Sequence, residues 1–388
     1  RTMAISFPIP LPMFKRALLL LGCFAIVIQQ GYAQRYDSLL NAIRQSRSDT
    51  TTIQLYHLLS EEIVLKDSAA ARAYEDSALY IATRIKSPKY ISITLTNIGA
   101  IYRNRSEFAK ANTYYKKALE ASPHFSPWLG QTYLEAGISL WRMTELDSAL
   151  TVLQLGVELV KEHPDSQVEA SLYNAMGNVK RQQNRYEEAI DLYIQSLKLF
   201  EQRNDLRGQT QALSNISNIH NLIGNTDKAL DYAIQSLETA KAAGVRSSIA
   251  YSYRLLGRIY RKQSKPDAAL KVYEDALAVY KEIHARRDVL ETELSIGNVY
   301  FDKQYLNEAI RHYRLALGMG KTIDDNLSLG LSYLTIGNAL LELKKYDQAK
   351  NYLDSALVVS QKKKLASFAM DSYHLQCALR RRQKACRV

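Results

Sequence analysis

Hydrophobic and small residues between Tyr173 and Leu197 recur with the spacing of two short helices joined by a polar turn. In the first half, Tyr173, Met176 and Gly177 fall on one face of a 3.6-residue helix. In the second half, one face is made by Tyr186, Ala189, Tyr193, Ser196 and Leu197. Small residues on both faces predict close helix contact with tyrosines packed around it. Such a pair cannot bury both apolar faces alone, so it needs copies on either side.

The copies follow at a nearly fixed period. The first step is 38 residues and every later step is 40, through Gly99, Gly137, Gly177, Ser217, Gly257, Gly297 and Gly337. Twelve residues after each position stands an alanine: Ala111, Ala149, Ala189, Ala229, Ala269, Ala309 and Ala349. A glycine inside a helix costs about 1 kcal/mol relative to alanine. Glycines kept in one register therefore need a packing reason, and close contact between helices supplies it.

This combination of spacings resembles the tetratricopeptide repeat (TPR), in a form longer than the common one of about 34 residues. It is similar to the repeats of kinesin light chains and to extracytoplasmic sensor regions of some bacterial signalling proteins. The resemblance covers most of the chain after residue 50, with local departures at Ser217 and Glu293. It implies an all-α fold, a TPR α-solenoid built as a right-handed superhelix of antiparallel helix pairs.

The N-terminal stretch has the pattern of a secretory signal. Lys15 and Arg16 precede the apolar run Ala17–Ile28, and a polar segment follows up to Gln34. The run is shorter than the roughly 18 residues of a membrane span, so we expect cleavage before Gln34 and a periplasmic or secreted protein. The alternative is a lipoprotein anchored through Cys23, which ends a lipobox-like sequence.

The pattern divides the chain into four parts. Residues 1–33 are the predicted signal peptide, with 1–12 doubtful as part of it, and residues 34–50 form an N-terminal entry segment. Residues 51–366 hold about eight repeats, the first of them degenerate, and residues 367–388 form an incomplete ninth repeat or a capping helix.

Catalysis, cofactors and metals are not expected. The 7 histidines are scattered, with no pair at metal-ligand spacing. Gly318–Thr322 resembles a phosphate loop but has Leu315 where its first glycine belongs, and it follows a helix. The net charge of +12 falls to +9 once Arg1, Lys15 and Arg16 are removed with residues 1–33. Because basic residues alternate with acids on helix faces, nucleic acid is not the expected partner.

A second face of the first helix in each repeat is polar. It is formed by the residues three before, one after and four after the glycine position, which share one helix face. In TPR proteins this face lines the concave groove. Here it carries Asn174, Asn178, Arg181, Asn218, Asn221, Arg254, Arg258, Arg261, Asn298 and Asn338.

These side chains suit a peptide ligand. An amide donates and accepts at once, so a row of asparagines can hold the backbone of an extended peptide, and the resemblance points the same way. The three arginines, with no acid from Thr239 to Pro266, favour a carboxylate from an acidic side chain or a free C-terminus. The alternative is that these polar residues only keep the surface hydrated.

We therefore expect an exported, non-catalytic TPR protein without a stable membrane span. It would bind a protein or an extended peptide, acidic in the arginine region, in its groove. A role in signal sensing follows from the resemblance alone. A structural or assembly scaffold of the cell envelope is the competing interpretation.

Overall fold

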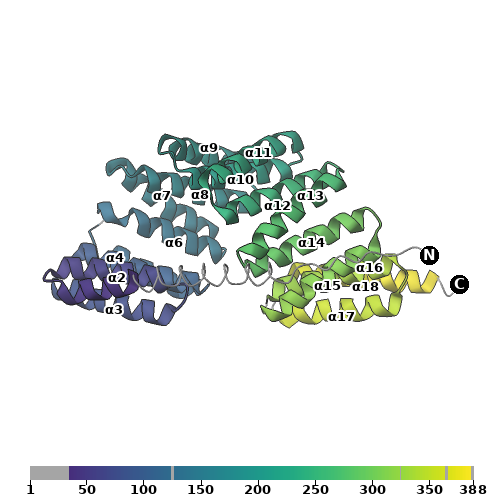
Figure 1. The fold of residues 1–388 in the computed structure, drawn as a ribbon, viewed down its shortest axis with the longest axis horizontal. Coiled ribbons are helices and arrows are strands. Elements are labelled where there is room, and N and C mark those ends of the chain that lie inside the picture. The colour runs from purple at the N-terminus through teal and green to yellow at the C-terminus, as the bar shows by residue number, and fades with distance from the viewer. Residues whose placement is uncertain (1–34, 124–125, 324, 363–365, 386–388) are drawn as a thin grey trace, which may run out of the picture. The chain divides into compact units, whose positions relative to one another are not determined.

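The computed structural model describes residues 35–123, 126–323, 325–362 and 366–385, and every regular element in these ranges is helical (Figure 1). The predicted signal peptide and Cys23 lie outside the described residues. The chain divides into two compact units, with the boundary in the sequence between Val179 and Lys180. The all-α class and the paired, repeating helices are as the sequence predicts. The four-part division of the chain stays a prediction.

The first unit begins with a helix over residues 35–45. It continues with α2 (Asp49–Ile63), α3 (Ser68–Arg84), α4 (Pro88–Asn104), α5 (Phe108–Glu120), the short η1 (Pro127–Leu129), α6 (Gly130–Arg142), α7 (Leu146–Glu162) and most of α8 (Ser166–Gln182). The pairs α2–α3, α4–α5 and α6–α7 pack as hairpins, and α3 and α5 also pack on the helix that follows each. Each helix thus buries one face within its pair and another against the next pair.

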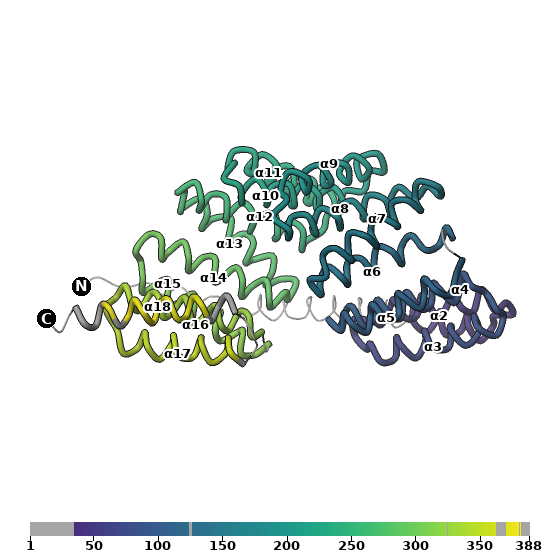
Figure 2. Tube along the Cα trace, turned by 180° about the vertical axis from the view of Figure 1, so that it is seen from behind, coloured from purple at the N-terminus to yellow at the C-terminus, as the bar shows by residue number. Residues whose placement is uncertain are grey.

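The second unit holds α9 (Tyr186–Gln202), α10 (Leu206–Leu222), α11 (Thr226–Ala243), α12 (Arg246–Lys262), α13 (Pro266–Glu282), α14 (Arg286–Asp302), α15 (Leu306–Thr322), α16 (Asn326–Glu342), α17 (Tyr346–Lys362) and α18 (Ala366–Ala385). Its hairpins are α10–α11, α12–α13, α14–α15 and α16–α17. The first helices of neighbouring hairpins also touch, α10 with α12, α12 with α14 and α14 with α16 (Figure 2). They therefore present a continuous face.

In the hairpins α4–α5, α6–α7, α12–α13, α14–α15 and α16–α17 the glycine makes room for a ring or a leucine sixteen residues later. A Cβ atom built on Gly297 would lie 2.5 Å from the Tyr313 ring, and one on Gly137 would lie 2.4 Å from Leu153. Real Cβ atoms do not come so close, so only glycine fits these backbones. The close helix contact inferred from the sequence is present.

The two sequence departures are compensated locally. Ser217 stands where other repeats have glycine, and the residue sixteen later is the small Ala233 instead of a tyrosine or leucine; the Ser217 hydroxyl donates to the Ala229 carbonyl at 2.6 Å. Glu293 occupies an aromatic position, and its carboxylate lies 2.8 Å from Nδ1 of the His312 ring. Both repeats keep the regular helix pair.

The turn inside each hairpin has a left-handed residue seven positions after the glycine slot. Thr144, Ser264 and Gln304 adopt φ of 64°, 56° and 63° there, and Gly224 adopts 89°. Left-handed backbone is unfavourable for residues with a Cβ atom, by roughly 1–2 kcal/mol. Its recurrence at one position indicates that the tight turn is needed to bring the two helices together.

The buried tyrosines predict alkaline sensitivity. Burial raises the pKa of Tyr193 to about 12, and burial likewise raises the pKa of Tyr273 and Tyr313. The unfolded chain ionises near pH 10 and the folded chain holds its phenolic protons longer. The stability they contribute is therefore present below about pH 10 and is lost as the pH rises towards 12. Titration followed by tyrosinate absorbance and circular dichroism should show some tyrosines ionising only as the helices melt. Complete ionisation near pH 10 with the helices intact would contradict this.

Candidate binding groove

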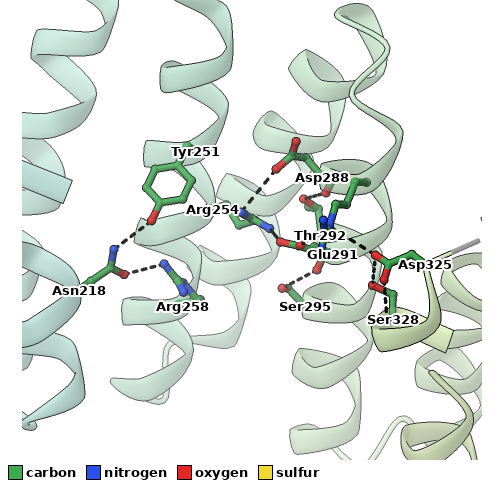
Figure 3. Close-up of polar contacts among 11 residues, drawn as sticks. Asn218, Tyr251, Arg254, Arg258, Asp288, Glu291, Thr292, Ser295, Asp325 and Ser328 are labelled. Atoms are coloured by element: carbon green, nitrogen blue, oxygen red, sulfur yellow. Dashed lines mark hydrogen bonds and ion pairs between the residues drawn. The ribbon is translucent and has the colours of Figure 1, made fainter. Parts of the chain in front are cut away.

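The face shared by α10, α12, α14 and α16 carries most of the candidate residues of the second unit. Two hollows open on it. The first has a volume of about 520 Å³ and lies between α10 and α12, with Tyr280 of α13 and Asp288 of α14 among its lining residues. The second, of about 290 Å³, is lined by residues of α12, α14 and α16. Polar side chains from successive repeats link the helices along this face (Figure 3).

Asn218 and Arg258 meet between α10 and α12. The Asn218 amide donates to the Tyr251 hydroxyl at 3.0 Å, and its oxygen accepts from Nη2 of Arg258 at 2.7 Å (Figure 3). Asn218 and Arg258 are one full period apart in the chain, which is why they face each other from equivalent positions of adjacent helices. Arg258 is exposed, and no carboxylate within the described ranges forms an ion pair with it.

Arg254 is paired with acids of the next repeat. Its guanidinium forms an ion pair with Glu291 and lies 3.6 Å from the Asp288 carboxylate, with 13% of the side chain exposed. Glu291 also lies 3.6 Å from Arg287, which reaches Asp325 at the start of α16 at 3.4 Å. Burial raises the pKa of Asp288, and Arg254 opposes that shift. Alternating positive and negative side chains thus connect α12, α14 and α16, and we call this series the charge ladder: Arg254, Asp288, Glu291, Arg287 and Asp325.

Arg261 is also neutralised, because it contacts both carboxylate oxygens of Asp302, at 2.5 and 3.3 Å. Two of the three arginines predicted to face a ligand are therefore already paired with carboxylates of this chain, and binding by all three stays a prediction. The sequence around these arginines contains no acid, but the carboxylates that pair with Arg254 and Arg261 belong to α14, about one period further along the chain. These acids stand 34 to 41 residues after the arginines in the sequence, and that offset indicates the pairing. Of the three, Arg258 is the one that forms no ion pair with a carboxylate of the described residues.

The other candidate residues are distributed as follows. Asn298 accepts from the Tyr313 hydroxyl at 2.7 Å and lines the second hollow. The backbone carbonyl of Asn221 accepts from Lys262, and Asn338 is half-buried on α16. Arg181 lies beside Tyr193. Asn174 and Asn178 belong to the first unit, and both are engaged in contacts there. The structure thus gathers Asn218, Arg254, Arg258, Arg261 and Asn298 in the second unit.

The second hollow has a polar and an apolar side. Arg258, Ser295 and Asn298 supply donors and acceptors, and Leu294, Leu327 and Leu331 supply apolar surface. Leu327 is 43% exposed. A surface of this kind suits an extended chain, whose backbone needs hydrogen bonds while alternate side chains need apolar contacts.

Other chemistry has little support in the part of the chain that the structure describes. In those ranges no cluster of three histidine, cysteine or acidic side chains is placed to hold a metal ion. None of the helices described is both long enough and apolar enough to cross a bilayer.

Sequence models of the tetratricopeptide repeat match residues 93–122, 128–202, 209–282 and 331–361. The comparison with curated proteins by sequence gives no match.

Several solved structures have a similar fold. A signal transduction ATPase with numerous domains (STAND) from Pyrococcus horikoshii, which has a tetratricopeptide repeat sensor, matches with a TM-score of 0.62 and 18% identity over 88% of this chain. This chain spans 54% of the length of that protein. The apo quorum sensor NprR from B. thuringiensis matches with a TM-score of 0.62 and 13% identity, covering 87% of this chain and 96% of NprR. A Rap protein complexed with competence and sporulation factor matches with a TM-score of 0.57 and 13% identity, covering 91% and 98%. At these identities the likeness concerns the fold.

Proposed function

This chain belongs to the tetratricopeptide-repeat proteins, which bind other proteins and peptides, and we propose that it binds an extended segment of a partner along α10, α12, α14 and α16. In this proposal binding is non-catalytic and serves signal sensing outside the cytoplasm. The export part rests on the signal-like pattern of residues 1–33 alone.

One observation carries the binding site. The position after the glycine slot is Asn218, Arg258 and Asn298 in three successive repeats, and each side chain is at least partly open to solvent. Beside them lies the second hollow with its apolar side. Donors and acceptors repeated at the helix spacing, next to apolar surface, match the needs of a peptide backbone with alternating side chains.

The sensing role has support of a different kind. Among the similar structures are a quorum sensor, a tetratricopeptide repeat sensor and a Rap protein complexed with a factor. Each of these descriptions applies to its own protein, and sensing by this chain is an inference by analogy of fold. A scaffold role in the envelope is the competing proposal, and no feature of the groove favours it.

The charges in the groove limit which peptide sequences can bind. Arg254 and Arg261 are already paired with carboxylates of this chain. We therefore expect Arg258 to bind a single acidic residue of the peptide, and we do not expect the groove to require several acidic residues. Arg258 can exchange its bond to the Asn218 oxygen for a stronger, charge-assisted bond to a carboxylate.

Selection from a synthetic library of short random peptides tests this proposal. The full chain should enrich peptides with one acidic residue, and Arg258→Glu should weaken their binding about tenfold or more. Lys271→Glu makes the same change of charge on an exposed position of α13 away from both hollows, and it should leave binding unchanged. Equal effects of the two variants, or no enriched peptide, would refute the site.

A further inference from the structure

The first hollow contains a buried hydroxyl without a partner. Tyr280 is 2% exposed, and its hydroxyl oxygen forms no hydrogen bond with any described residue. Buried polar atoms are nearly always satisfied, and an exception in a hollow suggests a missing ligand. We use the name Tyr280 pocket for this hollow, lined by Arg207, Thr210, Gln211, Ser214, Asn215, Val245, Ser247, Ser248, Tyr251, Tyr280 and Asp288.

Arg254 fixes one wall of the Tyr280 pocket. Its guanidinium carbon lies 5.8 Å from the centre of the Tyr280 ring and 5.6 Å from that of Tyr251. The same guanidinium attracts the Asp288 carboxylate at 3.6 Å, a distance longer than a hydrogen bond. Asp288 lines the same hollow as Tyr280 and keeps acceptor capacity for another group.

Several other polar groups of the wall are already used. The Thr210 hydroxyl donates to the Leu206 carbonyl at 2.7 Å, and the Ser214 hydroxyl lies 2.8 Å from that of Ser236. The Tyr251 hydroxyl accepts from Asn218. The Tyr280 hydroxyl, which can donate, and the Asp288 carboxylate, which can accept, remain available in the wall, whereas Arg207, Gln211 and Ser247 are exposed and can be hydrated.

A primary amide matches this pair. Its oxygen can accept from the Tyr280 hydroxyl while its NH2 group donates to Asp288. A carboxylate in the same place would meet the negative charge of Asp288, and an ammonium group would pair with Asp288 but offer no acceptor to the Tyr280 hydroxyl. An apolar side chain would leave the Tyr280 hydroxyl unsatisfied. Acidic, basic and apolar side chains are therefore each less favourable in the pocket than an amide.

We propose that the Tyr280 pocket binds the side-chain amide of a glutamine or asparagine residue in the bound segment. This inference rests on the proposed function, since it names one residue class of the same partner. The pocket and the second hollow are connected through Arg254, which lines the second hollow and pairs with Asp288 in the wall of the first. One extended chain can therefore place an amide in the first and apolar side chains in the second.

Positional peptide libraries test the inference. Each library fixes one position as glutamine, glutamate, lysine or leucine and leaves the others random. At one position the full chain should prefer glutamine over its near-isosteric acid, glutamate, by about tenfold. Tyr280→Phe removes only the hydroxyl and should abolish that preference while binding of the leucine library persists.

Tyr115→Phe is the matched control. Tyr115 is also a buried tyrosine whose hydroxyl lacks a partner among the described residues, but it lies in the first unit. This variant should keep the glutamine preference, and circular dichroism should show both variants folded. Peptide binding without a glutamine preference, or a preference that survives Tyr280→Phe, overturns the amide pocket alone. Failure of every library to bind overturns the proposed function together with it.

Discussion

Gly297→Leu should lower the free energy of unfolding by about 1–3 kcal/mol, whereas Gly318→Ala should leave it unchanged or raise it by up to about 1 kcal/mol. The first Cβ atom alone would lie 2.5 Å from the Tyr313 ring, so Tyr313 or the helix pair must move. At Gly318, on the partner helix α15, no atom lies within 4 Å of the added Cβ. The Gly297 variant therefore measures the effect of the close helix contact, and the Gly318 variant measures the effect of helix propensity alone.

Chemical denaturation of both variants measures the difference. A double change, Gly297→Ser with Tyr313→Ala, copies the natural pair Ser217 and Ala233. It should recover part of the stability that Gly297→Ser loses alone, because the clash is removed although some buried ring area is lost. If Gly297→Leu is as stable as the parent chain, the helix contact described here is wrong.

Arg254→Ala should destabilise the second unit by about 1–3 kcal/mol, and Arg258→Ala by no more than about 0.5 kcal/mol. Loss of Arg254 leaves Asp288 without its cation and Glu291 with Arg287 alone. The effect is smaller than for a fully buried pair, because these carboxylates remain 40% and 38% exposed. Arg258 forms a hydrogen bond with the Asn218 amide at the surface, so its loss leaves no carboxylate without a cation.

Thermal and denaturant unfolding distinguish the two arginines. A triple change of Arg254, Arg258 and Arg261 to alanine is consequently a poor test of binding, since it would also weaken the fold. Arg254→Met, which keeps the apolar stem, should recover only the packing part of the loss. If Arg254→Ala and Arg258→Ala behave alike, the charge ladder across α12, α14 and α16 does not contribute as the structure indicates.

Much of the fold could be predicted because helix periodicity and repeat spacing act within single helices and hairpins. The glycine and alanine positions indicated which helices pair. For example, Gly297 and Ala309 lie on α14 and α15, which form a hairpin in the structure. The pattern predicts tyrosines around the helix contact, whereas in the structure the Tyr313 ring lies directly against Gly297. Its placement depends on how the second helix is rotated, and the sequence pattern gives that rotation only approximately.

The candidate site was less predictable, because its charges are set between repeats. Asn218 and Arg258 share a helix position, so their meeting follows from the period. The pairing of Arg254 with Glu291 depends on how far one hairpin is displaced along the next and on long side-chain rotamers. The repeat pattern does not indicate the unsatisfied Tyr280 hydroxyl, since the equivalent positions of other repeats hold Phe200, Ala240 and Gly320.

Site-specific photo-crosslinking tests the central claim, that an extended peptide lies along α10, α12, α14 and α16. Benzoylphenylalanine replaces Leu327, which lines the second hollow and is 43% exposed, or Ile234, which is 40% exposed on α11 outside both hollows. With a peptide enriched by the full chain, illumination should crosslink the Leu327 variant and not the Ile234 variant, and excess unlabelled peptide should suppress the product. Crosslinking from Ile234 with none from Leu327 would contradict the proposed groove.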